Sequence, residues 1–132
     1  MHLIVCIDEH DGMSFCGKRL SSDRKLTEFI LNYTHGAKLW MNAYTAKLFT
    51  GEAVIADEDF LEKAGPGEYC FVENRSLDER KVPESVTLFR WNRVYPSTLK
   101  FPRSLLADMH LDYSVDFPGN SHDKITVERY TL

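Results

Sequence analysis

The feature that most constrains the fold is an uninterrupted apolar run near the N-terminus, residues 2–7 (HLIVCI), which is followed directly by acidic residues. Its length suits a strand, and it lacks the alternation of a strand that has one face in water. Such runs are typical of strands buried on both faces, in sheets that helices cover. Residues 2–7 therefore predict a central strand of an α/β sheet.

A helix is expected after this strand, beyond a glycine-containing loop at residues 9–21. Ser21 or Ser22 offers an N-cap, and Gly36 is placed to end the helix. Between these ends, apolar residues recur at helical spacing: Leu26, Phe29, Ile30 and Tyr33. This segment predicts an amphipathic helix that packs against the first strand.

The rest of the chain alternates strand and helix patterns and then ends in strands only. Further strands are expected at 38–42, 52–56, 68–73, 85–95, 110–117 and 124–132, short helices at 43–49 and 57–64, and loops at 74–85 and 96–107. This order predicts one domain over residues 1–132, with a mostly parallel sheet flanked by helices and a C-terminal antiparallel hairpin. A chain of 132 residues suits a single core.

Composition excludes several function classes. The net charge of −4 offers no large basic field, so nucleic acid is not an expected partner, and no apolar run is long enough to predict a membrane span. The three cysteines form no C-x-x-C pair, which favours a reducing cytoplasm. The five histidines show no metal-ligand spacing, so no metal site is expected.

Several segments, taken in order, resemble one family. The opening strand leads through Gly12 to Asp23 at a helix start, the next strand ends in Met41 before Thr45, and Phe101-Pro102 interrupts the last strands. In this pattern the chain resembles the dihydrofolate reductase family over most of its length. The resemblance implies a dihydrofolate reductase-like fold. It also implies that Asp23 is the acid that binds or protonates a heteroaromatic substrate.

Thr45 matches the family's motif, and the family's cofactor is NADPH. Tyr44 and Thr45 begin a short helix whose backbone N–H groups and Thr45 hydroxyl suit an anion, so these two are the candidate cofactor-binding residues. The sequence departs from the family where that cofactor is held. Ala43 stands where the family has a phosphate-binding arginine, and Glu73 and Asn74 stand where it has a Gly-Gly pair that lets the backbone approach the cofactor. These departures argue against a standard NADPH site.

Simpler roles are open for the same residues. Aspartate is common in the first turn of a helix, and Tyr44 and Thr45 suit an ordinary helix start. The basic residues near Asp23 suit either an anionic group or a solvated face; they are Lys18, Arg19, Arg24 and Lys25.

Three functions follow as hypotheses. The preferred one is a protein of reductase-like fold that has lost folate reduction and binds a small heteroaromatic or nucleotide ligand near Asp23. One alternative is an NADPH-dependent reductase with an altered site. The other is a protein-interaction module that uses the charged segment 74–85.

Overall fold

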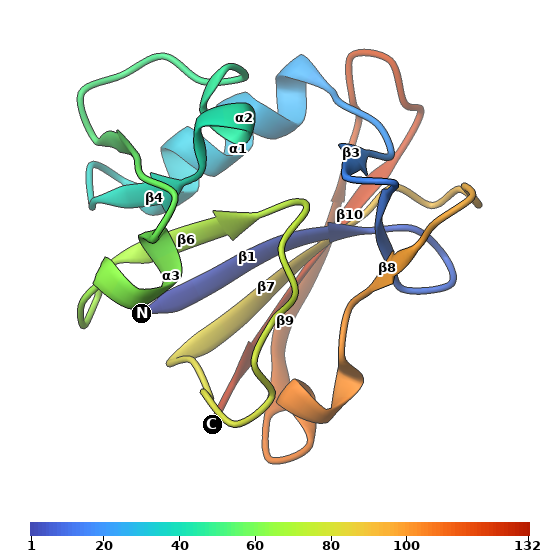
Figure 1. The fold of residues 1–132 in the computed structure, drawn as a ribbon. Helices are drawn as coiled ribbons and strands as arrows, with labels where there is room; N and C mark the ends of the chain where they lie inside the picture. The colour runs from blue at the N-terminus through green and yellow to red at the C-terminus, as the bar shows by residue number, and fades with distance from the viewer.

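The computed structural model describes all 132 residues, and its main feature is a seven-stranded sheet (Figure 1). In spatial order, the strands are β5 (Val54–Ala56), β4 (Leu39–Met41), β6 (Tyr69–Val72), β1 (His2–Ile7), β7 (Ser85–Arg90), β10 (Ile125–Thr131) and β9 (His110–Phe117). The first five run parallel to one another, while β10 is antiparallel to both β7 and β9. The predicted fold class, including the C-terminal hairpin, is confirmed.

The central strand β1 is buried on both faces, as its apolar run predicts. Alternate residues of β1 belong to two separate cores. Ile4 and Cys6 lie in the core that α1 (Arg24–Thr34) covers with Leu26 and Ile30. The side chains on the opposite face lie in a second core, with Phe60 of α3 (Phe60–Lys63) and Met13.

The loop predicted at residues 9–21 is partly a β-hairpin, which corrects that prediction. Strands β2 (Gly12–Phe15) and β3 (Lys18–Arg19) pair antiparallel, and β8 (Leu99–Lys100) adds a third strand on the other side of β2. These strands are too short to show a clear apolar alternation, so the sequence pattern did not reveal them. The region predicted as a loop at 96–107 thus contains β8 and a 3₁₀ turn, η1 (Arg103–Leu106).

Several element boundaries also differ from the prediction, including that of α3, which spans only Phe60–Lys63 where a helix over 57–64 is expected. Asp23, not Ser21 or Ser22, is the N-cap of α1, and α2 (Ala43–Ala46) is shorter than expected. Strand β7 ends at Arg90 because the backbone at Asn92 is left-handed, with φ of 59°, and turns the chain away.

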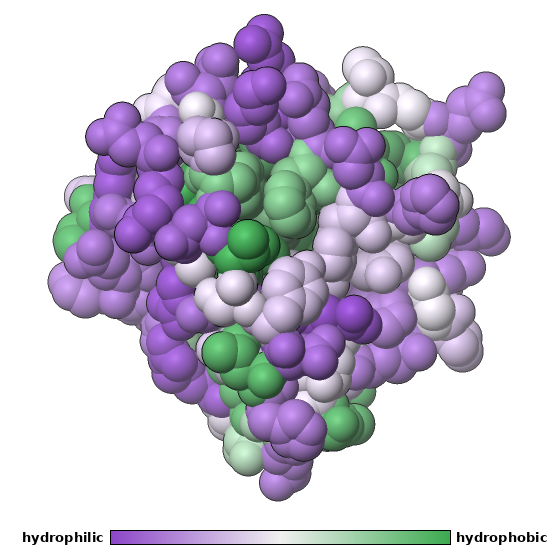
Figure 2. Space-filling model, turned by 180° about the vertical axis from the view of Figure 1, so that it is seen from behind, coloured by the Kyte–Doolittle hydropathy of each residue, from purple (hydrophilic) through white to green (hydrophobic).

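The surface is mostly polar on the face shown in Figure 2, where hydrophilic residues surround a smaller central area of hydrophobic and intermediate residues. None of the helices combines the length and hydrophobicity that crossing a bilayer requires.

Replacing Ile30 by alanine should lower the free energy of unfolding by about 2–5 kcal/mol, because its fully buried side chain joins α1 to the sheet. Urea denaturation measures this effect. Asn32→Ala is the matched control on the exposed side of the same helix and should change stability by less than about 0.5 kcal/mol. Equal losses in both variants would contradict the placement of α1.

Candidate functional site

Asp23 is the centre of a buried polar cluster at the N-terminus of α1. Its carboxylate caps the helix by accepting the N–H of Lys25 at 2.8 Å. It also accepts the N–H groups of Asn120 (2.9 Å) and Ser121 (2.8 Å), and Nδ1 of His122 lies 2.9 Å from Oδ2. The Ser121 hydroxyl adds a contact at 3.2 Å. One carboxylate therefore ties the helix start to the turn between β9 and β10.

The carboxyl group of Asp23 is ionised at neutral pH. Burial by itself would raise its pKa, since the side chain is 0% exposed. The hydrogen bonds from Asn120, His122, Ser121 and Lys25 outweigh that effect and hold the pKa well below its usual range.

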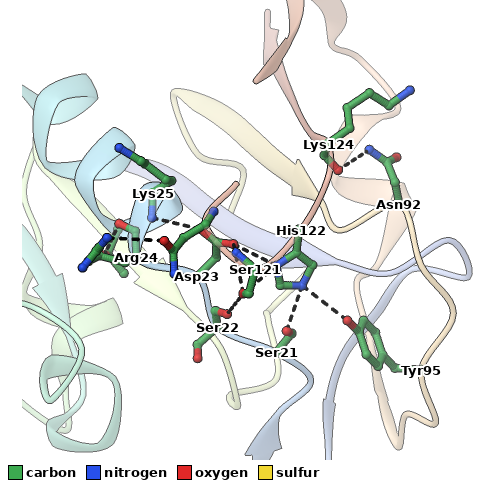
Figure 3. A network of polar contacts seen from close by, with 12 residues as sticks. Ser21, Ser22, Asp23, Arg24, Lys25, Asn92, Tyr95, Ser121, His122 and Lys124 are labelled. Atoms are coloured by element: carbon green, nitrogen blue, oxygen red, sulfur yellow. Dashed lines mark hydrogen bonds and ion pairs between the residues drawn. The ribbon is translucent and has the colours of Figure 1, made fainter. Parts of the chain in front are cut away.

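His122 links Asp23 to two hydroxyl groups (Figure 3). Its Nε2 lies 3.0 Å from Oγ of Ser21 and 3.4 Å from the hydroxyl of Tyr95. The indole of Trp91 stacks on the imidazole, with 4.7 Å between ring centroids, and leaves the His122 side chain only 2% exposed. Because Nδ1 faces an ionised carboxylate, it carries a proton, and Nε2 is the ring nitrogen that faces the two hydroxyl groups.

An open surface hollow of about 310 Å³ lies over the start of α1, and Asp23 and Lys47 are among its lining residues. The inner space between Asp23 and the sheet is almost filled. Its free volume is about 10 Å³, which is the lower limit for one water molecule. Phe71, Glu73 and Trp91 are among the side chains that line it. Asp23 thus lies at the predicted place in the fold, buried against protein groups, and its role toward a ligand stays a prediction.

Thr45 contacts a second buried carboxylate, that of Glu73, and Tyr44 contacts Arg19, the ion-pair partner of Glu73. The Thr45 hydroxyl donates to Glu73 at 2.9 Å, and the Thr45 N–H donates to Asn42, the N-cap of α2. Arg19 pairs with Glu73, with Nε 3.0 Å from Oε2, and its guanidinium lies over the Tyr44 ring, 4.2 Å from the centroid. Both residues predicted to bind a cofactor therefore contact this ion pair, and their cofactor role stays a prediction.

Two further hydrogen bonds near Glu73 help to attach the β2–β3 hairpin to the sheet. The Arg19 N–H donates to the Tyr44 hydroxyl at 3.1 Å, and the Asn74 amide donates to the Gly17 carbonyl at 2.9 Å. Glu73 and Asn74, the two departures from the family pattern, each hold the hairpin through a polar contact. The hairpin is consequently fixed across the end of β6.

The four basic residues near Asp23 do not form one cluster. Arg24 and Lys25 lie on α1 within 4.0 Å of Glu28, whereas Lys18 and Arg19 belong to the hairpin. Lys18 and Arg19 line a different surface hollow from the one that Arg24 lines.

An open groove of about 430 Å³ lies between the hairpin and the segment after β7. Its lining is partly aromatic and apolar and includes no acidic residue: Phe15, Cys16, Lys18, Arg19, Leu20, Tyr95 and Pro96. Asp8, at the end of β1, positions one wall by accepting the N–H of Tyr95 at 3.0 Å and that of Gly12 at 2.7 Å. Burial would raise the pKa of Asp8, but these backbone hydrogen bonds lower it overall.

A smaller pocket of about 140 Å³ lies beside Met1 and Leu3, beneath part of the charged segment 74–85. Two arginines of that segment already have partners, since Arg75 pairs with Glu58 and Arg80 with Asp78. No cluster of three or more histidine, cysteine or acidic side chains is arranged to hold a metal ion.

The sequence did not predict two pairs of contacting polar residues in this region. Ser21 and His122 are 101 positions apart, and Arg19 and Glu73 are 54 apart. Neither spacing follows a motif, so only the topology brings them together. A signal was available at Glu73, because a carboxylate at the end of a buried strand requires a partner.

No family model and no curated protein matches the sequence. Among solved structures, the fold is similar to that of dihydrofolate reductase from Enterococcus faecalis complexed with NADP(H) and RAB-propyl, with a TM-score of 0.68 and 13% sequence identity. The match covers 98% of this chain and 94% of that chain. The expected dihydrofolate reductase-like fold is confirmed, and this level of identity speaks for the fold alone.

Asp23→Asn should lower the free energy of unfolding at pH 7 by about 3 kcal/mol, because an amide replaces a buried charge that accepts several hydrogen bonds. Since the folded-state pKa is lowered, the contribution of Asp23 is complete above its unfolded pKa of about 3.9 and is lost as the pH falls further. The variant should therefore lose less stability than the wild type between about pH 5 and pH 2. Urea denaturation across this range tests the prediction, and parallel acid profiles would contradict it.

Proposed function

We propose that the protein binds a small, flat aromatic anion in the groove between the β2–β3 hairpin and the segment after β7. The single observation that carries the proposal is the lining of that groove, where Phe15 and Tyr95 accompany Lys18 with no acidic residue. Its volume of about 430 Å³ falls in the range of small-molecule sites, roughly 300–1,000 Å³.

The chemistry of the lining supports an aromatic ligand. Phe15 is 46% exposed, and burying it under an aromatic ring would remove apolar surface from water. The exposed ammonium of Lys18 suits a carboxylate or phosphate on the ligand. Arg19 is less available, because Glu73 already neutralises it.

The walls of the groove are held by buried polar contacts. Asp8 fixes Tyr95, and Glu73 fixes Arg19 and hence the hairpin. Walls held in this way lose little conformational entropy when a ligand binds. Asp23 takes part indirectly, since His122 lies between it and the Tyr95 hydroxyl.

We also infer that the chain no longer binds NADPH and has lost folate reduction. The support comes from the Glu73 carboxylate, which accepts the Thr45 hydroxyl and pairs with Arg19 where the resemblance implies a cofactor. A dinucleotide there would have to break a buried ion pair and place its phosphates near a carboxylate, and both changes are unfavourable.

Pterin-6-carboxylate, used as a probe of this ligand class, should raise the melting temperature, because a ligand at 100 times its Kd adds about 2.7 kcal/mol to stability. Neutral pterin at the same concentration should stabilise less. Lys18→Ala should weaken binding of the carboxylate about tenfold, since it removes the exposed cation of the groove. Thermal-shift titration measures these effects.

Lys25→Ala is the matched control, because Lys25 is an exposed lysine on α1 and does not line the groove. It should bind the probe like the wild type. If Lys18→Ala binds the probe as tightly as the wild type and Lys25→Ala do, the proposed site is overturned. Absence of any shift with pterin-6-carboxylate, adenosine monophosphate and folate would reject this ligand class.

NADPH at 1 mM should leave the melting temperature unchanged and show no change in its fluorescence on titration with the protein, because the Arg19–Glu73 ion pair lies beside Thr45, where the resemblance implies the cofactor. Saturable quenching or enhancement of the fluorescence would instead support the altered-reductase hypothesis.

A further inference from the structure

We propose that Ser21 is a nucleophile for acyl transfer, activated by His122 as general base, with Asp23 as the positioning residue. The proposal rests on the groove as the substrate site, and its substrate class is a small carboxylic ester whose acyl or alcohol part carries an anionic aromatic group. The three side chains come from the segment before α1, its N-cap and the β9–β10 turn.

The geometry carries the proposal. Oγ of Ser21 lies 3.0 Å from Nε2 of His122, and Nδ1 of the same ring lies 2.9 Å from Oδ2 of Asp23. This is the order nucleophile, base and carboxylate that activates a serine in acyl transfer, and it is recognised by geometry and not by sequence position.

The surroundings keep the base in one orientation. The Asp23 side chain is 0% and the His122 side chain 2% exposed, and the Trp91 indole stacks on the imidazole. Asp23 accepts backbone N–H groups from Asn120 and Ser121, so its own orientation is fixed from the same turn that carries His122. Ser21 is only partly buried.

The reacting atoms lie next to the proposed ligand site. Leu20 and Tyr95 line the groove and Leu20 directly precedes Ser21, which itself lines the narrow inner space beside Asp23. The Tyr95 hydroxyl lies 3.4 Å from the His122 Nε2 that faces Ser21. A second hydroxyl beside Nε2 is placed to donate a hydrogen bond to an oxygen of the substrate.

The reaction balances without any group other than water. Oγ of Ser21 bonds to the acyl carbon while its proton moves to Nε2 of His122, and the carbon–oxygen bond to the alcohol then breaks as the alcohol takes up that proton. Water next transfers a proton to Nε2 and attacks the acyl carbon. The acid leaves and Oγ regains the proton, so one ester and one water give one acid and one alcohol.

The test uses a biotinylated fluorophosphonate on the full chain, followed by peptide mapping. The wild type should be labelled at Ser21, and Ser21→Ala should lose the label. Ser22→Ala is the matched control, since Ser22 is the adjacent exposed serine and its hydroxyl makes no hydrogen bond, and it should be labelled at the wild-type rate. No label, label at another residue, or equal labelling of Ser21→Ala would overturn the proposal.

Hydrolysis of p-nitrophenyl acetate provides the second measurement. Ser21→Ala should reduce kcat by about 100-fold or more. Asp23→Asn, at a temperature where circular dichroism shows it folded, should lower kcat with little change in KM, because Asp23 does not touch the substrate. If kcat falls only in proportion to the fraction of unfolded protein, Asp23 is merely structural and its positioning role is rejected.

The failure of this inference is distinguishable from failure of the proposed function. Ser21→Ala should still bind pterin-6-carboxylate, because Ser21 does not line the groove. Retained binding in a wild type that is not labelled would reject the nucleophile alone. Labelling of Ser21 in a protein that binds none of the probes would support the nucleophile and reject the aromatic-anion site.

Discussion

The interaction on which the rest of the site depends is the buried charge of Asp23. A carboxylate without access to water must be satisfied by donors, and here the donors come from two separate parts of the chain. The N–H of Lys25 belongs to α1, while Asn120, Ser121 and His122 belong to the turn before the last strand. Satisfying this one charge therefore determines how the C-terminal hairpin meets the first helix. It also holds the imidazole of His122 in the one orientation that faces Ser21 and Tyr95.

A second buried charge, on Glu73, organises the other side of the site. Its pairing with Arg19 and its contact with Thr45 attach the β2–β3 hairpin to the end of β6 and the start of α2. The hairpin in turn forms one wall of the groove, through Phe15 and Lys18. The chain thus combines a reductase-like scaffold with a closed interior and an open groove outside it. Glu73 departs from the family pattern in a way that argues against a dinucleotide. The same residue holds this groove in place through Arg19.

The sequence predicted the scaffold well and the site only in part. Residues 2–7 form a strand buried on both faces because their apolar side chains point to both sides of the sheet, and exposing either side to water is unfavourable. Asp23 is where the pattern placed it, at a helix start. Its partners were not predictable, because His122 lies 99 residues further along the chain and shares no motif with it. The hairpin at 12–19 was missed for a similar reason. Its short strands depend on β8 and on the Arg19–Glu73 ion pair more than on local preference.

The sequence by itself determined the strands of the seven-stranded sheet, the helices between them, their order and the two apolar faces of the central strand, because hydrophobic periodicity and helix capping are local properties of neighbouring residues. Only the tertiary structure decided which charges meet. Asp23 with His122 and Glu73 with Arg19 are pairings across the chain, set by the sheet order and by the need to neutralise carboxylates in the interior. The tertiary structure also decided that the inner space between Asp23 and the sheet is almost filled and that the open groove lies against Tyr95. Side chains from distant segments come together only in the folded chain, so only the fold decides which spaces they fill.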